Sequence, residues 1–379
     1  MDRARVYLDH NATSPLCPPA KAAMTAALEV FGNPSSIHRE GRAARDIIET
    51  ARRDIAALVG ADPADIVLTS GGTEADGLAI FGLWAAAPDR PPRIATAGIE
   101  HPAVIGAAHT AVAGRGDGEV AWLATDGDGV IDGDSLAASL RLGCRLVAVG
   151  LANHELGTLQ DVAAMARATR AAGAHLHVDA VQAAGKIPVD VTALGADTVA
   201  ISAHKIGGPK GAGALWIRPG LDIAPTHAAG HQERERRPGT ENVVGIAGFG
   251  AAARVARETC RQDMAALASL LEDGLGEIPG TRIHGRGAPR VGNTVNAGFS
   301  GVLGETLCQA LDLAGFAVST GAACTSGSVK PSAVLLAIGL SADEAKSAVR
   351  FSLGPTTTEA EIRALVAALP ALVARARAV

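Results

Sequence analysis

Short apolar runs alternate with longer, Ala-rich stretches through the first two thirds of the chain. The runs are rich in Val, Ile and Leu and predict strands at 66–70, 93–98, 145–152, 174–180 and 197–202. The stretches between them, such as those at 56–61 and 161–173, predict helices. Strands that alternate with helices indicate a mainly parallel sheet covered on both faces, so we expect an α/β fold.

The pattern changes after about residue 250. A long apolar-periodic segment at 251–278 predicts one long helix, which shorter strands and helices follow. The Ala-rich tail at 364–379 predicts a final helix. We expect a large domain at 15–255 and a smaller α+β domain formed by residues 1–14 and 256–379.

Composition narrows the function without identifying it. The 379 residues are 48% hydrophobic, and the net charge of −5 is spread along the chain. This charge distribution argues against nucleic acid or an anionic membrane as the main partner. The N-terminus lacks the apolar core of a secretory signal and no apolar run is long enough to span a bilayer, so we expect a cytoplasmic enzyme. Five dispersed cysteines without a CxxC pair argue against a disulfide framework.

Polar and ionisable residues follow several of the predicted strands. Ligands of parallel α/β sheets bind beyond the C-terminal ends of the strands, so a site is expected there. The residues concerned are Thr69-Ser70-Gly71-Gly72-Thr73, Asn153-His154-Glu155, Asp179 and Ser202-Ala203-His204-Lys205.

Asp179 and Lys205 follow two successive predicted strands. A lysine amine can hold pyridoxal phosphate (PLP) as an imine, while a carboxylate keeps the pyridine nitrogen protonated so that the ring acts as an electron sink. A buried carboxylate needs a compensating partner, so a structural ion pair between Asp179 and Lys205 is the alternative.

The segment 69–74 offers glycines and hydroxyls where a helix would begin, a favourable place for a phosphate group. Ser202 and His204 could add donors. An ordinary turn with a helix cap is the alternative. His101 could stack on a flat cofactor ring or transfer protons, or it could be a hydrogen-bonded histidine near a helix start.

Two further residues point to chemistry outside this strand edge. Cys324 lies in a segment at 319–332 that is rich in Gly, Ser, Ala and Thr, which predicts an exposed loop and favours a reactive thiol over an incidental one. Arg350 lies in an apolar run at 349–354. It could bind a substrate carboxylate through two hydrogen bonds, or form a salt bridge between domains.

Taken together, these motifs resemble the cysteine desulfurases, which are PLP enzymes of fold type I in the class-V aminotransferase group. The resemblance covers nearly the whole chain in the family's order and spacing. It lies in segments 7–15, 31–45, 69–80, 100–106, 151–160, 177–190, 202–215, 231–250, 319–328 and 349–362. It implies a large domain with a mainly parallel seven-stranded sheet between helices and a smaller α+β domain that carries the Cys324 loop.

The resemblance also implies a role for each matching residue. Lys205 would hold PLP and then act as acid and base, Asp179 would pair with the pyridine nitrogen, and His101 would stack on the ring. Cys324 would be the nucleophile that takes sulfur. The remaining roles are Gln182 on the ring hydroxyl, Gly72, Thr73, Ser202 and His204 on the phosphate, Thr240 on the phosphate of the neighbouring subunit, and Asn153 and Arg350 on the substrate.

The implied reaction converts L-cysteine to L-alanine and leaves a persulfide on Cys324 for transfer to an acceptor protein. Shared sites imply a homodimer. The sequence after Cys324 resembles the long-loop branch of the family, which serves iron–sulfur assembly, and two segments look like its nitrogenase-associated members. An iron–sulfur scaffold is therefore an expected acceptor, and Cys324 could transiently ligate a cluster through its persulfide.

Six positions, at four places in the chain, depart from the family pattern without removing a residue assigned to chemistry. His10 and His154 stand where asparagine is more common, Ala75-Asp76-Gly77 replaces Ser-Asn-Asn, and Gly208 replaces a tyrosine. Two other functions stay open. One is a selenocysteine lyase or other C–S lyase on the same scaffold, and the other is a non-enzymatic scaffold for iron–sulfur assembly.

Overall fold

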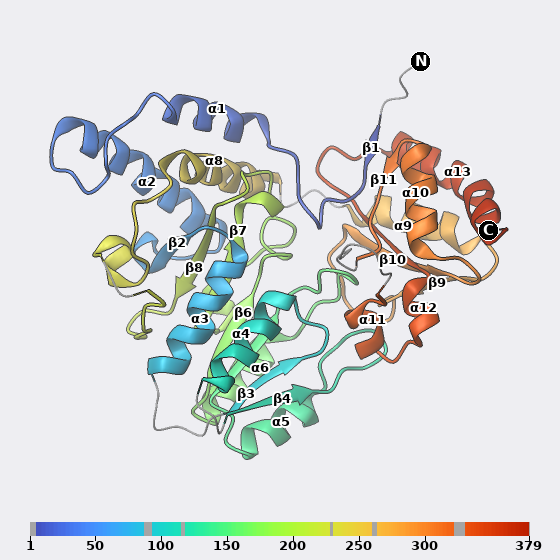
Figure 1. Cartoon of the computed structure of the whole chain (residues 1–379), viewed down its shortest axis with the longest axis horizontal. Helices are drawn as coiled ribbons and strands as arrows, with labels where there is room; N and C mark the ends of the chain where they lie inside the picture. The colour runs from blue at the N-terminus through green and yellow to red at the C-terminus, as the bar shows by residue number, and fades with distance from the viewer. Residues whose placement is uncertain are drawn as a thin grey trace.

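The computed structural model describes residues 5–86, 93–114, 118–227, 230–259, 264–321 and 330–378. A large sheet unit and a smaller unit lie side by side (Figure 1). Both marked chain ends lie on the side of the smaller unit (Figure 1). The residues Cys324 and 322–329 around it fall outside the described ranges.

The large sheet has seven strands in the order β2-β8-β7-β6-β5-β3-β4. Neighbours from β4 to β7 pair in parallel, whereas β8 runs antiparallel to β2 and β7. The expected mainly parallel α/β sheet is therefore confirmed. The strands are β2 (Ile66–Thr69), β3 (Arg93–Ala97), β4 (Glu119–Leu123), β5 (Leu146–Gly150), β6 (His175–Asp179), β7 (Thr198–Ser202) and β8 (Gly213–Ile217).

Helices cover both faces of this sheet because its strands are apolar on both sides. On β5, Leu146 and Ala148 pack with one helical layer, and Val147 and Val149 pack with the other. The first layer contains α3 (Gly72–Ala86) and α4 (Pro102–Ala113). The second contains α2 (Arg39–Leu58), α5 (Gly133–Arg141), α6 (Val162–Ala171) and α8 (Val243–Thr259), with α1 (Pro18–Ala27) packed on α8 and the short α7 (Val191–Leu194) nearby.

The smaller unit is built on an antiparallel sheet, β12-β10-β9, and a parallel pair, β1-β11. Its core gathers residues such as Leu271, Phe299, Leu307 and Leu369. Its elements are β1 (Val6–Tyr7), α9 (Ala265–Gly276), β9 (Thr281–His284), β10 (Thr294–Phe299), α10 (Gly304–Leu313), β11 (Phe316–Ala317), β12 (Ala348–Ser352) and α13 (Glu359–Arg377).

Two C-terminal helices pack differently from the rest of that unit. Val334 and Leu335 of α11 (Ala333–Ala337) and Ala345 of α12 (Ala342–Lys346) belong to the core of the large sheet. The segment from α11 to β12 therefore connects the two cores. The domain boundaries proposed from the sequence stay predictions.

The single long helix predicted at 251–278 is wrong. The chain forms α8, which ends at Thr259, and α9, which begins at Ala265. Phe249 and Ala256 of α8 pack in the large core, while Leu271 and Leu275 of α9 pack in the small one. Apolar periodicity continues across the junction because each helix buries a face, but the faces meet different cores.

The predicted tail helix is confirmed as α13, which begins with a capping box between Thr358 and Glu361. In the part of the chain that the structure describes, we find no helix that combines the length and the apolar character of a membrane span.

Candidate active site

A cavity of about 260 Å³ opens at the C-terminal ends of the parallel strands. It lies at the strand edge where the sequence places a site. Its walls are Gly72, Thr73, Asp76, Glu100, His101, Gly150, Ala152, Asn153, His154, Asp179, Val181, Gln182, Ser202, His204 and Lys205. The fold thus brings together all the predicted cofactor-binding residues except Thr240.

One end of the cavity offers unused hydrogen-bond donors to an anion. The backbone enters α3 at Gly72, where a Cβ atom would lie 2.7 Å from Val181 Cγ2, so only glycine fits without movement. The hydroxyl of Ser202 is buried and has no hydrogen-bond partner. Burial lowers the pKa of His204 to about 4, with Lys205 as a second cause, so its ring is neutral. A phosphate group fits this end because it would satisfy the buried hydroxyl and the helix N-terminus.

Asp179 lies at the end of β6, and its Oδ1 accepts a hydrogen bond of 2.8 Å from the Val181 amide. Burial raises the pKa of Asp179 to about 7, and the nearby Asp76 adds to the rise. A buried carboxyl with a raised pKa is suited to a cationic ring nitrogen, which would hold it ionised.

Lys205 follows β7, and its Nζ donates to the carbonyl oxygens of Asn11 at 2.5 Å and Ala12 at 2.9 Å. No ion pair joins Lys205 to Asp179 in the described residues, so the structural ion pair considered as an alternative is absent. Burial lowers the pKa of Lys205 to about 8, and Arg350 adds to the fall. The amine is therefore partly neutral near physiological pH, as a nucleophilic lysine must be.

His101 caps α4, and its Nδ1 accepts a hydrogen bond of 3.1 Å from the Ala103 amide. The capping role considered as an alternative is thus real, and the same ring also lines the cavity. Burial lowers the pKa of His101, while Asp179 opposes the shift. The ring of His154 meets it edge-on, with centroids 5.4 Å apart and planes at 77°.

The two predicted amide ligands already have protein partners. Asn153 donates to the Ile99 carbonyl at 2.8 Å and accepts from two backbone amides, which fixes the loop after β5. Gln182 donates to the Asn11 carbonyl at 2.9 Å and accepts from Lys186 at 2.5 Å. Both side chains line the cavity, but a ligand would share them with these bonds.

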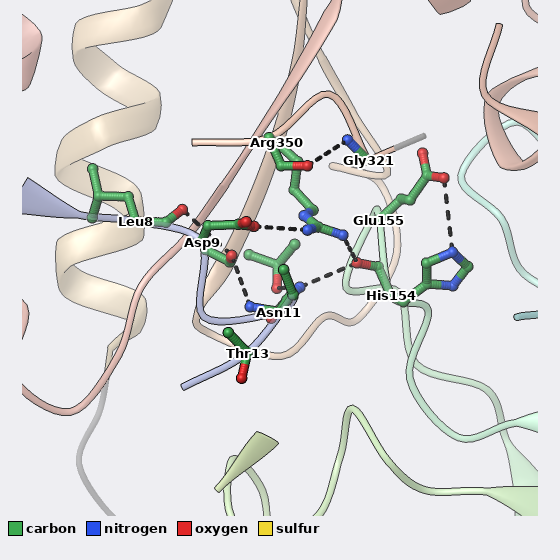
Figure 2. Close-up of polar contacts among 12 residues, drawn as sticks. Leu8, Asp9, Asn11, Thr13, His154, Glu155, Gly321 and Arg350 are labelled. Carbon is green, nitrogen blue, oxygen red and sulfur yellow. Dashed lines mark hydrogen bonds and ion pairs between the residues drawn. The ribbon is translucent and has the colours of Figure 1, made fainter. Parts of the chain in front are cut away.

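Arg350 does not line the cavity. Figure 2 shows its guanidinium between Asp9 and the backbone of His154. Nη2 lies 2.8 Å from Asp9 Oδ1 and Nη1 donates to the His154 carbonyl at 3.0 Å, while the buried Nε has no partner. The salt bridge considered as the alternative is present with Asp9, but Asp9 forms a β-bridge with Ser352 of β12, so both of its partners belong to the smaller unit.

Thr240, another predicted site residue, does not line the cavity. Thr240 is exposed in the segment before α8. Cys324 lies outside the described residues, so its predicted role is untested. Among the ranges that the structure describes, no group of three His, Cys, Asp or Glu side chains is arranged to hold a metal ion.

Several residues that shape the cavity had no predicted role from the sequence. Asp76 and Glu100 line it as buried carboxyls, and burial raises the pKa of each to about 8. Asn11 connects the two units: its carbonyl accepts from Lys205 and Gln182, and its Oδ1 accepts from Lys186 at 2.6 Å. The motif at 7–15 was the available signal, but the pattern assigned no role to Asn11.

Two departures from the family pattern have packing explanations. A Cβ atom at Gly354 would lie 2.0 Å from Cε1 of the buried His10, so the histidine ring occupies space that glycine leaves free. A Cβ atom at Gly208 would lie 2.9 Å from Ala203 Cβ, which leaves no room for a side chain on this backbone.

Comparisons with known proteins agree with the interpretation of the cavity as a cofactor site. The family described as "Aminotransferase class-V" matches residues 6–365. The cysteine desulfurase of Cereibacter sphaeroides is 42% identical over 99% of this chain and 97% of its own. A NifS-like protein from Rickettsia africae is 32% identical with a TM-score of 0.87, covering 97% of this chain and 99% of the other. A structure described as SspA in complex with cysteine is 29% identical with a TM-score of 0.82, covering 93% and 100%.

These matches extend over both units and all the strands that end at the cavity. Members of this family and its cysteine desulfurases depend on PLP, which fits the amine, the carboxyl and the anion site described above. The chain belongs to the class-V aminotransferase family, within its cysteine desulfurases.

Proposed function

We propose that this protein is a PLP-dependent cysteine desulfurase that converts L-cysteine to L-alanine and leaves a persulfide on Cys324. The observation that carries the proposal is the cavity in which Lys205, Asp179 and the unpartnered Ser202 hydroxyl converge. An amine, a carboxyl and an anion site at one strand edge match the three ends of PLP. The cysteine desulfurases at about 40% identity support the same substrate.

The chain's own residues would divide the binding of PLP. Lys205 would hold its aldehyde carbon, Asp179 its ring nitrogen and Gln182 its ring hydroxyl. Gly72, Thr73, Ser202 and His204 would hold its phosphate, and His101 would pack against its ring. Bound PLP supplies an electron-withdrawing ring that stabilises negative charge at the substrate's α-carbon.

Lys205 would then accept the α-proton of the substrate. A free Nζ with a pKa of about 8 would be an effective base near neutral pH. His101, neutral because burial lowers its pKa, is a further proton acceptor in the cavity wall, and Asp179 acts on its charge. We assign His101 two roles. It would orient the cofactor ring, and it would accept the proton of the substrate thiol.

Cys324 would carry out the sulfur transfer. Its thiolate attacks the substrate sulfur, a sulfur–sulfur bond forms and the carbon–sulfur bond breaks. The electron pair of the broken carbon–sulfur bond passes to the substrate's β-carbon, which takes up a proton. The product then leaves as alanine. The transferred sulfur remains as a persulfide, so no external oxidant is needed.

Arg350 would bind the substrate carboxylate together with Asn153. Since Arg350 is paired with Asp9, the substrate carboxylate must displace the Asp9 carboxylate from the guanidinium. The electrostatic cost of this exchange is small, because the guanidinium keeps an anionic partner throughout.

We further propose a homodimer in which Thr240 reaches the neighbouring subunit's phosphate site. Thr240 is exposed in the single subunit, and a residue that contacts a neighbouring subunit must be exposed in this way. Phe31 and Ile37, between α1 and α2, are 86% and 91% exposed, and such large apolar side chains favour burial by a second copy.

The sulfur acceptor would be a protein such as an iron–sulfur scaffold, and the enzyme would work in the cytoplasm. In this setting the Cys324 persulfide could also bind a cluster transiently. The resemblance of the Cys324 segment to the long-loop branch supports this part of the proposal.

Reconstitution with PLP tests the enzyme. The wild type should gain an absorbance band at roughly 390–420 nm and form equal amounts of alanine and persulfide sulfur from L-cysteine. Lys205→Ala should lose both, whereas Lys21→Ala on the exposed face of α1 should keep both. A wild type that binds no PLP would favour a non-enzymatic scaffold. A strong preference for selenocysteine over cysteine would favour a selenocysteine lyase.

A further inference from the structure

A second buried carboxyl lies beside Asp179 in the cavity wall. Asp76 belongs to α3, its side chain is only 2% exposed, and it lines the cavity. Its Oδ1 lies 3.1 Å from Nε2 of His177. An asparagine in its place could not ionise. This chain therefore has an additional titratable group at the cofactor site.

His177 connects Asp76 to a third residue. Its Nδ1 lies 2.9 Å from the hydroxyl of Thr198, and both residues are fully buried. His177 precedes Asp179 by two positions on β6, so the two side chains lie on the same face of the sheet. The imidazole is thus held at both nitrogens, directly beside the carboxyl assigned to the ring nitrogen.

The two hydrogen bonds of His177 depend on each other. Burial lowers the pKa of His177 to about 4, so the ring is neutral and has one N–H donor and one acceptor nitrogen. If Asp76 is protonated, its O–H can donate to Nε2, and Nδ1–H then donates to Thr198. If Asp76 is ionised, Nε2–H donates to the carboxylate, and the Thr198 hydroxyl donates to Nδ1. The tautomer of His177 therefore reports the charge of Asp76.

The charges around Asp76 favour a single ionised carboxyl. Asp179 and Glu100 line the same cavity, and each carries a pKa that burial and the neighbouring carboxyls raise. The basic groups that line the cavity are His101, His154, His204 and Lys205, and the pKa of each is lowered. Three carboxylates in so small a space would repel one another, so protons must remain on two of them near neutral pH.

We propose that Asp76 is a positioning residue that, by keeping its proton and sharing it with His177, leaves Asp179 as the ionised carboxyl beneath the cofactor's ring nitrogen. The identity of the cofactor rests on the proposed function. The proton on Asp76 is a property of the protein itself. Above the pH at which Asp76 ionises, a second negative charge reaches the ring site and the His177 tautomer reverses.

Nitrogen NMR of histidine-labelled protein tests this directly, with the His177 signals assigned from His177→Gln. In the wild type, the His177 proton should be on Nδ1 at about pH 6.5 and on Nε2 at about pH 9.5. Asp76→Asn should abolish this pH-dependent exchange, while Asp222→Asn at an exposed site should retain it. A single unchanged His177 tautomer in the wild type, or an exchange that persists in Asp76→Asn, would overturn the proposal.

The absorbance of bound PLP provides a second measurement. In the holoenzyme, Asp76→Asn should lower the midpoint of the pH titration of this absorbance by about half a pH unit or more, because the variant cannot supply the second negative charge. Superimposable titrations would contradict the proposed link to the ring site. A wild type that binds no PLP would contradict the proposed function instead, and the tautomer measurement would still stand. The pH-dependent exchange in the wild type does not depend on the stability of Asp76→Asn.

Discussion

The two ends of the site differ in how their polar side chains are paired: the cofactor end keeps an unpartnered hydroxyl, whereas the arginine at the substrate end already has partners. At the cofactor end, Ser202 keeps a buried hydroxyl without a partner and Gly72 leaves space for a ligand. At the substrate end, Arg350 is already paired with Asp9 and with the His154 carbonyl (Figure 2). A resident cofactor can occupy a preformed site for the life of the protein, whereas a substrate that leaves in every cycle favours a site with its own counterion.

The origin of the residues explains this difference. The cofactor residues follow strands of one parallel sheet, so their places follow from the fold of one unit. Arg350 belongs to β12 of the smaller unit, and its partners come from the N-terminal segment and from the loop after β5. The substrate end therefore depends on how the two units meet.

The largest effect should come from the cofactor end. Asp179→Ala removes the carboxyl proposed to pair with the ring nitrogen, and alanine production should fall on the order of 10²–10³-fold because the ring would lose its electrostatic support. Steady-state kinetics with saturating PLP measures this. Asp222→Asn, at an exposed site, is the matched control and should keep the rate. Equal rates for the wild type and Asp179→Ala would remove Asp179 from the site.

A smaller effect is expected at the substrate end. Arg350→Ala removes the guanidinium proposed to bind the substrate carboxylate, so KM for L-cysteine should rise roughly 10–100-fold while PLP binding persists. Comparison of KM with the PLP dissociation constant distinguishes the two ends. A loss of PLP binding with an unchanged KM would show that Arg350 serves the cofactor end.

The two ends are also coupled electrostatically. Burial and Arg350 lower the pKa of Lys205 to about 8, so the rate of PLP uptake by the apoprotein should rise about tenfold per pH unit below that value and level off above it. Arg350→Gln removes a positive neighbour and should move the break to higher pH. Stopped-flow absorbance measures both profiles, and identical breaks would show that Arg350 does not act on Lys205.

The stability of the apoprotein should show the same shift with a defined sign. The folded protein binds fewer protons at Lys205 than the unfolded chain does between about pH 8 and about pH 10.4, so this group makes stability rise with pH across that window. Denaturant titrations of the wild type and Lys205→Met measure the difference. The slope should be smaller in the variant, and equal slopes would contradict the lowered pKa.

The smallest effect concerns the counterion. Asp9→Asn removes the carboxylate that competes for Arg350, so KM for L-cysteine should fall roughly two- to fivefold. The PLP dissociation constant serves as the internal control and should not change. A raised KM would indicate that Asp9 orients Arg350 instead of competing for it.

Local patterning predicted most of the cofactor end. The strands before Thr69, Asp179 and Ser202 are continuous apolar runs, and their ends were visible as polar residues. β4 and β8 were missed, because β4 is partly exposed and β8 lies in a glycine-rich stretch. The long helix at 251–278 was wrong because periodicity records that a face is buried and does not record which core buries it.

The sequence by itself determined the class of fold, the strand edge that carries the site, and the family, through motifs that run along the whole chain. Only the tertiary structure decided how the charges meet. It brought together three pairs that more than a hundred positions separate in the sequence. They are the hydrogen-bonded pairs Asp76–His177 and Asn11–Lys205 and the ion pair Asp9–Arg350. The reason is physical, since strand and helix patterns depend on neighbouring residues, whereas pKa values and ion pairs depend on atoms that are close in space.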